Sequence, residues 1–273
     1  FWSVLGVMLG ARLGYVFFYE PQLLWHIESS LPFWGPLAVH RGGMSAHGGM
    51  IGVIVSFLLF SKKHKCSPFH LFDLAAVAVT PGLFFGRIAN FINAELWGRP
   101  LSPGLQVDRP WWSVCYPTEI LQKWLPSGDN RLSQLDLLRL EDSSLTSYQT
   151  IVQMVQDGNE KICSTVEPLL TPYWPSQLIQ ALTDGPMLLG LLILVWIKPR
   201  RGGVVGCCFL IFYGLFRFLT EFVRQPDEGV ALFFGFSRGQ QLSFLMIICG
   251  IAFLVFVQKT QKSFFGGLIK KIP

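Results

Sequence analysis

The run from Leu71 to Ile92 reads LFDLAAVAVTPGLFFGRIANFI. Its only charged residues are Asp73 and Arg87, and every other position is apolar, small or an uncharged polar residue. Its length is close to the ~20 residues that a helix needs to cross about 30 Å of hydrocarbon. The run therefore predicts a membrane-spanning helix that carries two ionisable side chains.

Five further apolar runs of similar length flank this one. They are Phe1–Phe18, Met44–Phe60, Pro175–Ile197, Val204–Val223 and Gln240–Val257. The whole chain is 51% hydrophobic and 14% charged, whereas soluble globular chains usually carry about 25% charged residues. We therefore predict an all-α polytopic integral membrane protein with six transmembrane helices in this sequence, bound in the lipid bilayer.

The orientation follows from the lysines and arginines next to the runs, because such residues are enriched on the cytoplasmic side. One set of loops and the C-terminal tail hold most of them: Lys62, Lys63, Lys65, Lys198, Arg200, Arg201, Lys259, Lys262, Lys270 and Lys271. Placing this set in the cytoplasm puts the loop at about 19–43 and the long segment 93–174 outside. The predicted divisions are membrane helices in 1–92, an extracytoplasmic head in 93–174, and membrane helices with a cytoplasmic tail in 175–273.

The segment 93–174 is polar and rich in proline, and we expect a small head of low regularity. It contains Cys115 and Cys163, for which a disulfide and two free thiols are both open. The six cysteines of the chain form no CxxC pair, so no metal site is predicted. The basic residues fall in small groups between apolar runs, which excludes a nucleic-acid partner.

Ionisable residues inside the apolar runs are costly in lipid and are therefore the first functional candidates. They are Arg12, Asp73, Arg87, Asp184, Arg217 and Glu221. We expect capping or structural roles for the two aspartates. Arg87 is predicted about 8 Å below the outer surface, at a depth where it meets Arg217, Glu221 and His47.

Arginines at this depth suit a phospholipid phosphate, because the guanidinium fork can bind a phosphate with two hydrogen bonds. Arg12 also falls near an outer helix end. The alternative for Arg217 and Glu221 is an internal ion pair, since they are separated by one helical turn.

The stretch Gly42–Gly49 reads GGMSAHGG and places His47 among four glycines. A helix that begins here directs amide N–H groups and the positive end of its dipole outward, which favours an anion. The same positive end favours the neutral imidazole, which can act as a base. The alternative is that the glycines serve helix packing and the histidine is only hydrogen-bonded.

The stretch Gly86–Arg99 reads GRIANFINAELWGR. On a continued helix Arg87, Asn90 and Ala94 share a face, with Asn93 close to it, and Trp97 would anchor at the membrane interface. The alternative is a polar turn that ends the helix. In a later run Tyr213, Arg217 and Glu221 are spaced by four and share one helical face.

Four segments resemble the bacterial phosphatidylglycerol–prolipoprotein diacylglyceryl transferases: Gly10–Pro21, Gly42–Gly52, Gly86–Arg99 and Phe212–Asp227, with a weaker fifth at Gly239–Ser243. The resemblance implies a seven-helix inner-membrane fold whose first helix is absent here. It also implies that the essential positions are His47, Arg87, Asn90, Gly98, Tyr213, Arg217 and Glu221. The sequence departs from the family at Trp174, where a His usually precedes Pro-Ser-Gln.

The resemblance implies transfer of the diacylglyceryl group of phosphatidylglycerol to the lipobox cysteine thiol in a prolipoprotein signal peptide. Arg87 and Arg217 would hold the phosphate while Asn90 and Asn93 orient the headgroup. Glu221 would position Arg217, Tyr213 would donate a hydrogen bond, and His47 would accept the thiol proton. No metal or cofactor is needed, and the site would lie near the outer leaflet of the bacterial cytoplasmic membrane.

Two other classes remain open from the residues alone. Buried arginines and a glycine-broken helix also suit an anion transporter or lipid flippase, which predicts polar groups along a path to both faces. A non-catalytic lipid-binding scaffold would not need a histidine beside the arginines. The crowding of polar groups at the outer end favours the enzyme.

Overall fold

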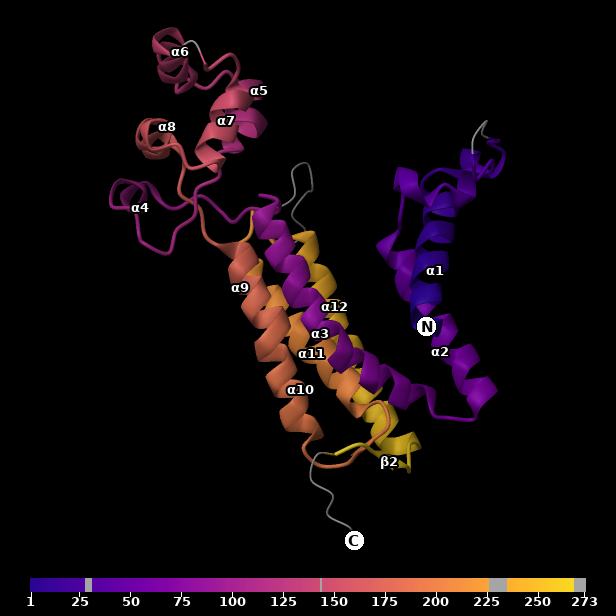
Figure 1. Ribbon diagram of the computed structural model, residues 1–273. Coiled ribbons are helices and arrows are strands. Elements are labelled where there is room, and N and C mark those ends of the chain that lie inside the picture. The colour runs from indigo at the N-terminus through magenta and orange to yellow at the C-terminus, as the bar shows by residue number, and fades with distance from the viewer. Residues whose placement is uncertain (28–30, 143, 226–234, 268–273) are drawn as a thin grey trace. The chain divides into compact units, whose positions relative to one another are not determined.

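The computed structural model describes residues 1–27, 31–142, 144–225 and 235–267, and these are mostly helical (Figure 1). The predicted cytoplasmic Lys270 and Lys271, and Asp227 of the fourth family segment, lie outside these ranges. The chain divides into two compact units. The first comprises Phe1–Ala76, Trp196–Gly206 and Leu254–Pro273, and the second comprises Val77–Val195 and Cys207–Phe253.

In the first unit, helix α1 (Trp2–Phe18) packs closely against α2 (Ala46–His64). A Cβ atom added at Gly14 would lie 2.7 Å from the Cα of Gly48, and one at Gly10 would lie 2.8 Å from the Cα of Gly52. The two backbones approach this closely only because side chains are absent there. The packing alternative, stated for the glycines of Gly42–Gly49, is therefore confirmed at Gly48, and Gly52 serves the same contact.

Between α1 and α2 lie three short 3-10 helices, η1 (Pro21–Leu24), η2 (Gly35–Leu37) and η3 (Val39–Arg41). The first unit also holds a small antiparallel ribbon in which β1 (Arg200–Arg201) pairs with β2 (Phe264–Phe265). The sequence did not predict this ribbon, which joins the loop after the fourth apolar run to the tail.

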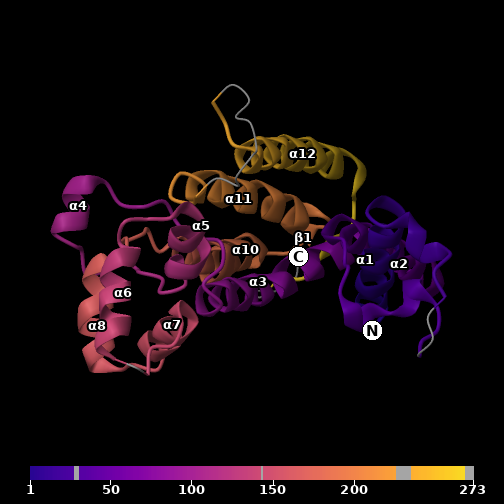
Figure 2. The ribbon, with the colours of Figure 1, turned by 90° about the horizontal axis from the view of Figure 1, so that it is seen from above.

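The remaining apolar runs form long helices. They are α3 (Pro68–Ile92), α9 (Ser176–Leu182) continued by the π-helical turn η6 (Thr183–Met187) and α10 (Leu188–Trp196), α11 (Val204–Thr220) and α12 (Arg238–Thr260). Figures 1 and 2 show α3, α10, α11 and α12 running side by side. Gly214 of α11 meets Ser243 and Ile247 of α12, so small residues again allow close packing.

Three helices in the described residues are long and apolar enough to cross a membrane: Pro68–Ile92, Ser176–Trp196 and Arg238–Thr260. Two shorter apolar helices are Trp2–Phe18 and Val204–Thr220. The prediction of an all-α membrane protein agrees with this composition.

Asp73 has the capping role that the sequence predicted for it. Its buried carboxylate accepts hydrogen bonds from the backbone N–H of Gly203 at 2.7 Å and of Gly206 at 2.8 Å. Both amides lie at the start of α11, where helical N–H groups lack partners within the helix. Asp73 therefore caps α11 from α3.

The head is more regular than the sequence predicted. Its elements are α4 (Pro103–Val107), η4 (Ile120–Trp124), α5 (Leu125–Ser127), α6 (Leu132–Glu141), α7 (Tyr148–Gln156), α8 (Glu160–Val166) and η5 (Glu167–Leu169). Ser147 caps α7 and Asn159 caps α8 through side-chain oxygens. Helices this short give weak periodicity, so the expectation of low regularity was wrong.

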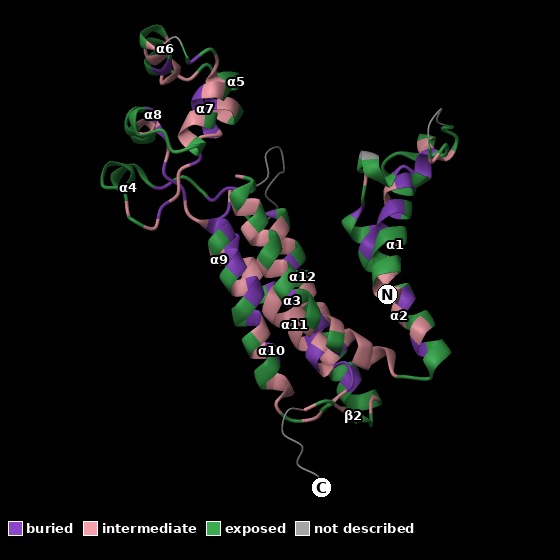
Figure 3. Cartoon of the chain, in the orientation of Figure 1, coloured by how far each residue is buried: buried purple, intermediate pink, exposed green. Residues whose placement is uncertain are grey.

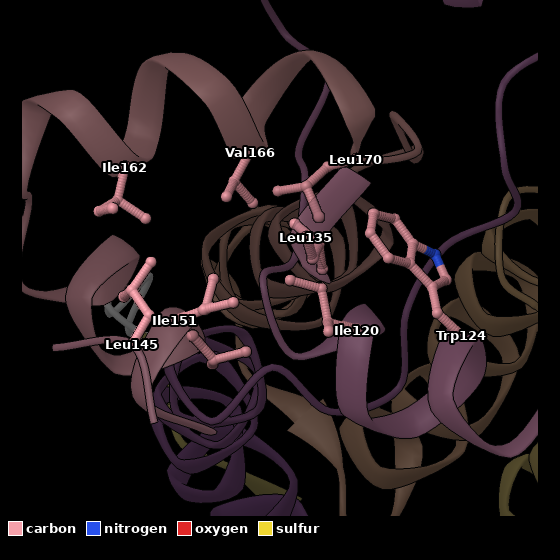
Figure 4. Close-up of a cluster of buried hydrophobic side chains, with 9 residues drawn as sticks. Ile120, Trp124, Leu135, Leu145, Ile151, Ile162, Val166 and Leu170 are labelled. Carbon is pink, nitrogen blue, oxygen red and sulfur yellow. The ribbon is translucent and has the colours of Figure 1, made fainter. Parts of the chain in front are cut away.

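A hydrophobic core within the head holds these helices together. Figure 4 shows side chains from separate helices converging, among them Ile120, Leu135 and Ile151, which are each fully buried. Cys115 and Cys163 carry free thiols, which decides between the two alternatives. Burial raises the pKa of the Cys115 thiol to about 11, so this group is neutral at physiological pH.

Candidate active site

The central feature of the second unit is an ion pair between helices. Arg87 Nε of α3 lies 3.4 Å from Oδ2 of Asp184, which is fully buried. Arg87 itself retains 18% of its side-chain exposure. A buried carboxylate requires a partner of opposite charge, and here it holds one side of the guanidinium. Arg87 has no acidic partner in its own helix, but it has this one from another.

Asp184 reaches this position through a π-helical turn. The turn η6 interrupts the continuous helix from Ser176 to Trp196 and contains Pro186. Proline lacks the N–H group of a regular helix and its ring conflicts with the carbonyl one turn earlier, which favours a local widening of this kind. Gly185 lies against Phe84 of α3, where an added Cβ would be 2.6 Å from the Phe84 Cβ. This close contact brings Asp184 to Arg87.

A second charged group lies at the end of α11. Glu221 Oε2 lies 2.9 Å from Arg217 Nη1 and 3.6 Å from Arg224 Nη1. The predicted ion pair of Arg217 with Glu221 is therefore present, and a second arginine shares the carboxylate. The sum of these three charges is positive, so one carboxylate does not neutralise the group.

The start of α12 supports the same carboxylate. Ser237 Oγ donates to Glu221 Oε1 at 3.0 Å and accepts from the Gln240 backbone N–H at 3.2 Å. Gln240 in turn accepts from the Ser237 N–H at 3.0 Å, which completes a reciprocal capping box. Gly239 leaves room for Glu221, because an added Cβ would lie 2.6 Å from its Oε1.

Tyr213 joins the two charged groups. It lies one turn before Arg217 on α11, stacks on Phe209 at 5.5 Å, and is within hydrogen-bonding reach of Arg87. Arg217 lies within electrostatic range of both Arg87 and Asp184. The predicted convergence of Arg87, Arg217 and Glu221 is thus present in the second unit, whereas His47, which was expected to meet them, belongs to the first unit.

The polar turn after α3 differs from the predicted continued helix. The helix ends at Ile92, and Ala94 and Leu96 have positive φ angles of 51° and 55°. Asn90 is half-buried and donates from Nδ2 to Glu95 Oε2 at 3.0 Å, while Asn93 is exposed just beyond the helix end. The face shared by Arg87, Asn90 and Ala94 was therefore wrong beyond Ile92, because the chain turns there.

Gly98 is buried where three chain segments meet. It forms a bridge with Arg224, and an added Cβ would lie 2.9 Å from the Cβ of Trp174 and in direct collision with its carbonyl oxygen. The flanking bonds run from Arg99 N–H to the Val223 carbonyl at 2.9 Å and from Trp174 N–H to the Arg99 carbonyl at 3.0 Å. Gly98 therefore aligns the segment that carries Arg224.

Trp97 is a packed residue and not the interface anchor that the sequence predicted. It is 6% exposed and stacks on Tyr116 at 4.9 Å, with Tyr173 beside it. Lys123 lies over Trp97 at 4.7 Å and donates to Gln225 Oε1 at 3.1 Å. Burial raises the pKa of the Tyr116 phenol to about 12, so this cluster stays uncharged apart from the lysine.

Arg12 and His47 belong to the first unit. The Arg12 guanidinium donates to four backbone carbonyls, those of Gly35, Pro36, Gly42 and Gly43, at 2.7–3.0 Å. Arg12 therefore fastens the loop between α1 and α2, and its expected contribution to a phosphate site stays a prediction. His47 is exposed in the first turn of α2, two residues after the N-cap Ser45.

Sequence reasoning missed three participants: Asp184, Arg224 and Ser237. Asp184 was assigned a structural role because its partner lies on a distant helix, and Arg224 lies just beyond the apolar run Val204–Val223 in which charged candidates were sought. The S-x-x-Q pattern from Ser237 to Gln240 was the available signal for the third. Within the described ranges no group of three or more His, Cys, Asp or Glu side chains could hold a metal ion.

Comparison with known proteins gives a family over nearly the whole chain. The family model described as prolipoprotein diacylglyceryl transferase matches residues 1–256. The chain is 37% identical over 271 residues to a phosphatidylglycerol–prolipoprotein diacylglyceryl transferase of Bdellovibrio bacteriovorus, covering 93% of this chain and 77% of the relative. It is 38% identical over 256 residues to that of Stenotrophomonas maltophilia, covering 93% and 74%. The chain therefore belongs to the prolipoprotein diacylglyceryl transferases, a family of transferase enzymes.

Proposed function

We propose that this protein transfers the diacylglyceryl group of phosphatidylglycerol to the lipobox cysteine of prolipoproteins, the first step of bacterial lipoprotein maturation. The names of its relatives state phosphatidylglycerol and prolipoprotein as the substrates. The observation that carries the proposal is the buried cluster around Arg87 and Arg217. Its positive charge is opposite to that of the lipid phosphate, which an enzyme for this reaction must bind.

The cluster suits a phosphate. Arg87, Arg217 and Arg224 contribute three positive charges against the two carboxylates of Asp184 and Glu221. The excess positive charge in a water-poor setting attracts an anion more strongly than it would in water. Guanidinium groups also bind phosphate oxygens in pairs.

The geometry of the ion pairs points to the same ligand. Arg217 Nη1 lies 2.9 Å from Glu221 Oε2 and Asp184 Oδ2 lies 3.4 Å from Arg87 Nε, but among the described residues none of the buried atoms Arg217 Nη1, Asp184 Oδ2 and Glu221 Oε2 makes a hydrogen bond of good geometry. Buried polar atoms normally make hydrogen bonds as well. A headgroup offers both kinds of partner, since phosphate oxygens accept from the arginine and glycerol hydroxyls donate to the carboxylates.

The reaction then balances as a displacement at a glycerol carbon. The cysteine sulfur forms a C–S bond to that carbon while the C–O bond to phosphate breaks, and glycerol phosphate leaves. Arg87 and Arg217 stabilise the charge that grows on the departing phosphate. The thiol proton goes to His47, because the thiolate is the nucleophile. Asn90, Asn93, Gly98 and Tyr213 complete the substrate-binding set.

We place the site near the outer leaflet of the bacterial cytoplasmic membrane, with six membrane-spanning helices and the head outside. Lys62, Lys63 and Lys65 at the end of α2 support this orientation, because such residues are enriched on the cytoplasmic side. Arg87 and Arg217 both lie within two turns of the helix ends that adjoin the head or the segment bridged to it.

The test uses membranes that contain the protein, labelled phosphatidylglycerol and a peptide with a lipobox cysteine. Thioether product should form with the unchanged protein. We expect Arg87→Ala to lower the rate by about 100-fold or more, the scale of losing a group that stabilises transition-state charge. The control is Lys161→Ala, which removes an exposed head charge and should leave the rate unchanged.

The other outcomes separate the alternatives. If His47→Ala retains the normal rate, the base assignment fails while the transferase remains. If the unchanged protein binds phosphatidylglycerol but forms no thioether, the transferase proposal fails. Movement of labelled lipid across the membrane in that case would favour a transporter.

A further inference from the structure

One loop of the head begins and ends beside the same residue, Tyr173. Pro100 and Val114 both form bridges with Tyr173, and the Leu101 N–H donates to the Pro172 carbonyl at 2.9 Å. The residues between them, 102–112, include α4 and form a projection that we call the 102–112 loop. Its base is therefore fixed two residues before Pro175, the N-cap of α9.

The tip of this loop exposes large apolar side chains. Trp111 is 94% exposed, Val107 is 85% exposed and Leu105 is 41% exposed. Figure 3 shows α4 coloured as exposed along its length. A cluster of such residues on a water-facing surface is unfavourable, and it usually marks an interaction site.

The loop is held so that these side chains face outward. Arg109 Nη1 pairs with Glu167 Oε1 at 2.8 Å, and Arg109 Nε donates to Ser113 Oγ at 3.3 Å. Trp112, the neighbour of Trp111, turns back and packs on Trp174 with ring centroids 4.6 Å apart. The cation and one indole thus contact the head, whereas Val107 and Trp111 stay exposed.

The position of the 102–112 loop relative to the membrane helix that follows it indicates which partner its apolar side chains contact. Trp174 lies two residues before the start of the helix Ser176–Trp196, which is long and apolar enough to cross a membrane. In Figure 1, α4 lies close to the height of the end of α9 that adjoins the head, whereas α6 lies at the far end of the head. A loop fixed at the first residues of a membrane helix lies at the headgroup region, where tryptophan is enriched.

We propose that the 102–112 loop inserts Trp111 and Val107 into the outer headgroup region of the bilayer and thereby holds the head down on the membrane beside α9. The partner is the lipid surface itself. Asp108, also exposed on this loop, stays in the hydrated part of that region. The head is then fixed at the membrane by two features, its covalent connection to the helices and this loop.

Tryptophan fluorescence of the full chain in vesicles of phosphatidylethanolamine and phosphatidylglycerol tests the proposal. The difference between the unchanged protein and Trp111→Phe isolates the Trp111 emission. This emission should be quenched by lipids brominated near the carbonyl end of the acyl chain and protected from aqueous iodide. The matched reference is Leu140→Trp, because Leu140 is 83% exposed on α6 at the far end of the head. Its added emission should be quenched by iodide and not by brominated lipid.

Two results would overturn the proposal. Iodide quenching of Trp111 equal to that of the Leu140→Trp reference would place the loop in water. Protection from iodide without quenching by brominated lipid would show that protein covers the loop instead. Neither measurement depends on enzyme activity, so the test stands apart from the proposed transfer reaction.

Discussion

At the scale of single residues, Asp184 is the group whose change is most informative. Asp184→Asn keeps the side-chain shape but removes the charge that faces Arg87 Nε at 3.4 Å. Arg87 then loses the partner that orients its guanidinium. We expect kcat/KM for lipid transfer to fall about 10- to 100-fold, or about 1.4–2.7 kcal/mol of transition-state stabilisation. Initial rates over a range of phosphatidylglycerol concentrations measure this.

Two further variants show whether a lower rate of Asp184→Asn comes from the lost charge at this position. Asp184→Glu restores the charge and should recover part of the lost rate. Asp157→Asn removes an exposed carboxylate of the head and should change nothing. An Asp184→Asn protein with the normal rate would show that Arg87 needs no orienting partner.

Cys115 gives a second prediction at this scale. Because burial raises the pKa of its thiol to about 11, only about a thousandth of it is thiolate at pH 8, and the thiolate is the reactive form. The exposed Cys66 should therefore be alkylated first by iodoacetamide in the folded protein. Mass spectrometry of the labelled peptides measures the order, and equal rates at the two sites would contradict the burial of Cys115.

At the scale of elements, Gly98 determines how three segments meet. Gly98→Ala places a methyl group on the carbonyl oxygen of Trp174, so the backbone bridge to Arg224 must open. Overpacking of this kind typically costs about 1–3 kcal/mol of stability. We expect a lower thermal midpoint in detergent and a lower transfer rate, because the displaced bridge carries Arg224 and adjoins Glu221.

The matched control is Gly190→Ala in α10. Among the described residues, no atom outside the backbone of its own helix lies within 4 Å of a Cβ added there, and alanine is the better helix former by about 1 kcal/mol. This variant should keep its activity and unfold at the same or a higher temperature. If Gly98→Ala and Gly190→Ala have the same transfer rate and the same thermal midpoint, the close contact of Gly98 with Trp174 is not required for either property.

At the scale of the whole molecule, the head has its own hydrophobic core and should unfold as a separate step. Leu135→Ala opens a cavity at a fully buried position of α6, and such changes cost about 2–5 kcal/mol. We expect proteases to cut the head of this variant at lower temperature while the membrane helices resist. Limited proteolysis in membranes, followed by mass spectrometry, locates the cuts.

Leu140→Ala is the control on the same helix, because Leu140 is 83% exposed. Exposed substitutions of this kind usually change stability by less than about 0.5 kcal/mol. Simultaneous cleavage of the head and of the loops between the membrane helices in Leu135→Ala would show instead that the molecule unfolds in one step.

The sequence alone predicted the helices well because a chain in lipid must satisfy its backbone hydrogen bonds within each segment. The run Leu71–Ile92 became α3 with a start only three residues earlier, at Pro68. The prediction that Arg87, Arg217 and Glu221 converge also followed from depth, since charged side chains in lipid face the protein interior. The proximity of His47 to this cluster stays a prediction.

Only the tertiary structure decided which partner each of these side chains takes. Asp184 and Arg87 lie on separate helices. The π-helical turn at Pro186, which brings Asp184 to Arg87, leaves no periodic signal in the sequence. Trp97 was expected at the lipid interface and is instead stacked in a buried aromatic cluster. The head gave weak signals because its helices are short. Length and hydropathy determine where a segment lies, whereas contacts between distant segments determine what its side chains bind.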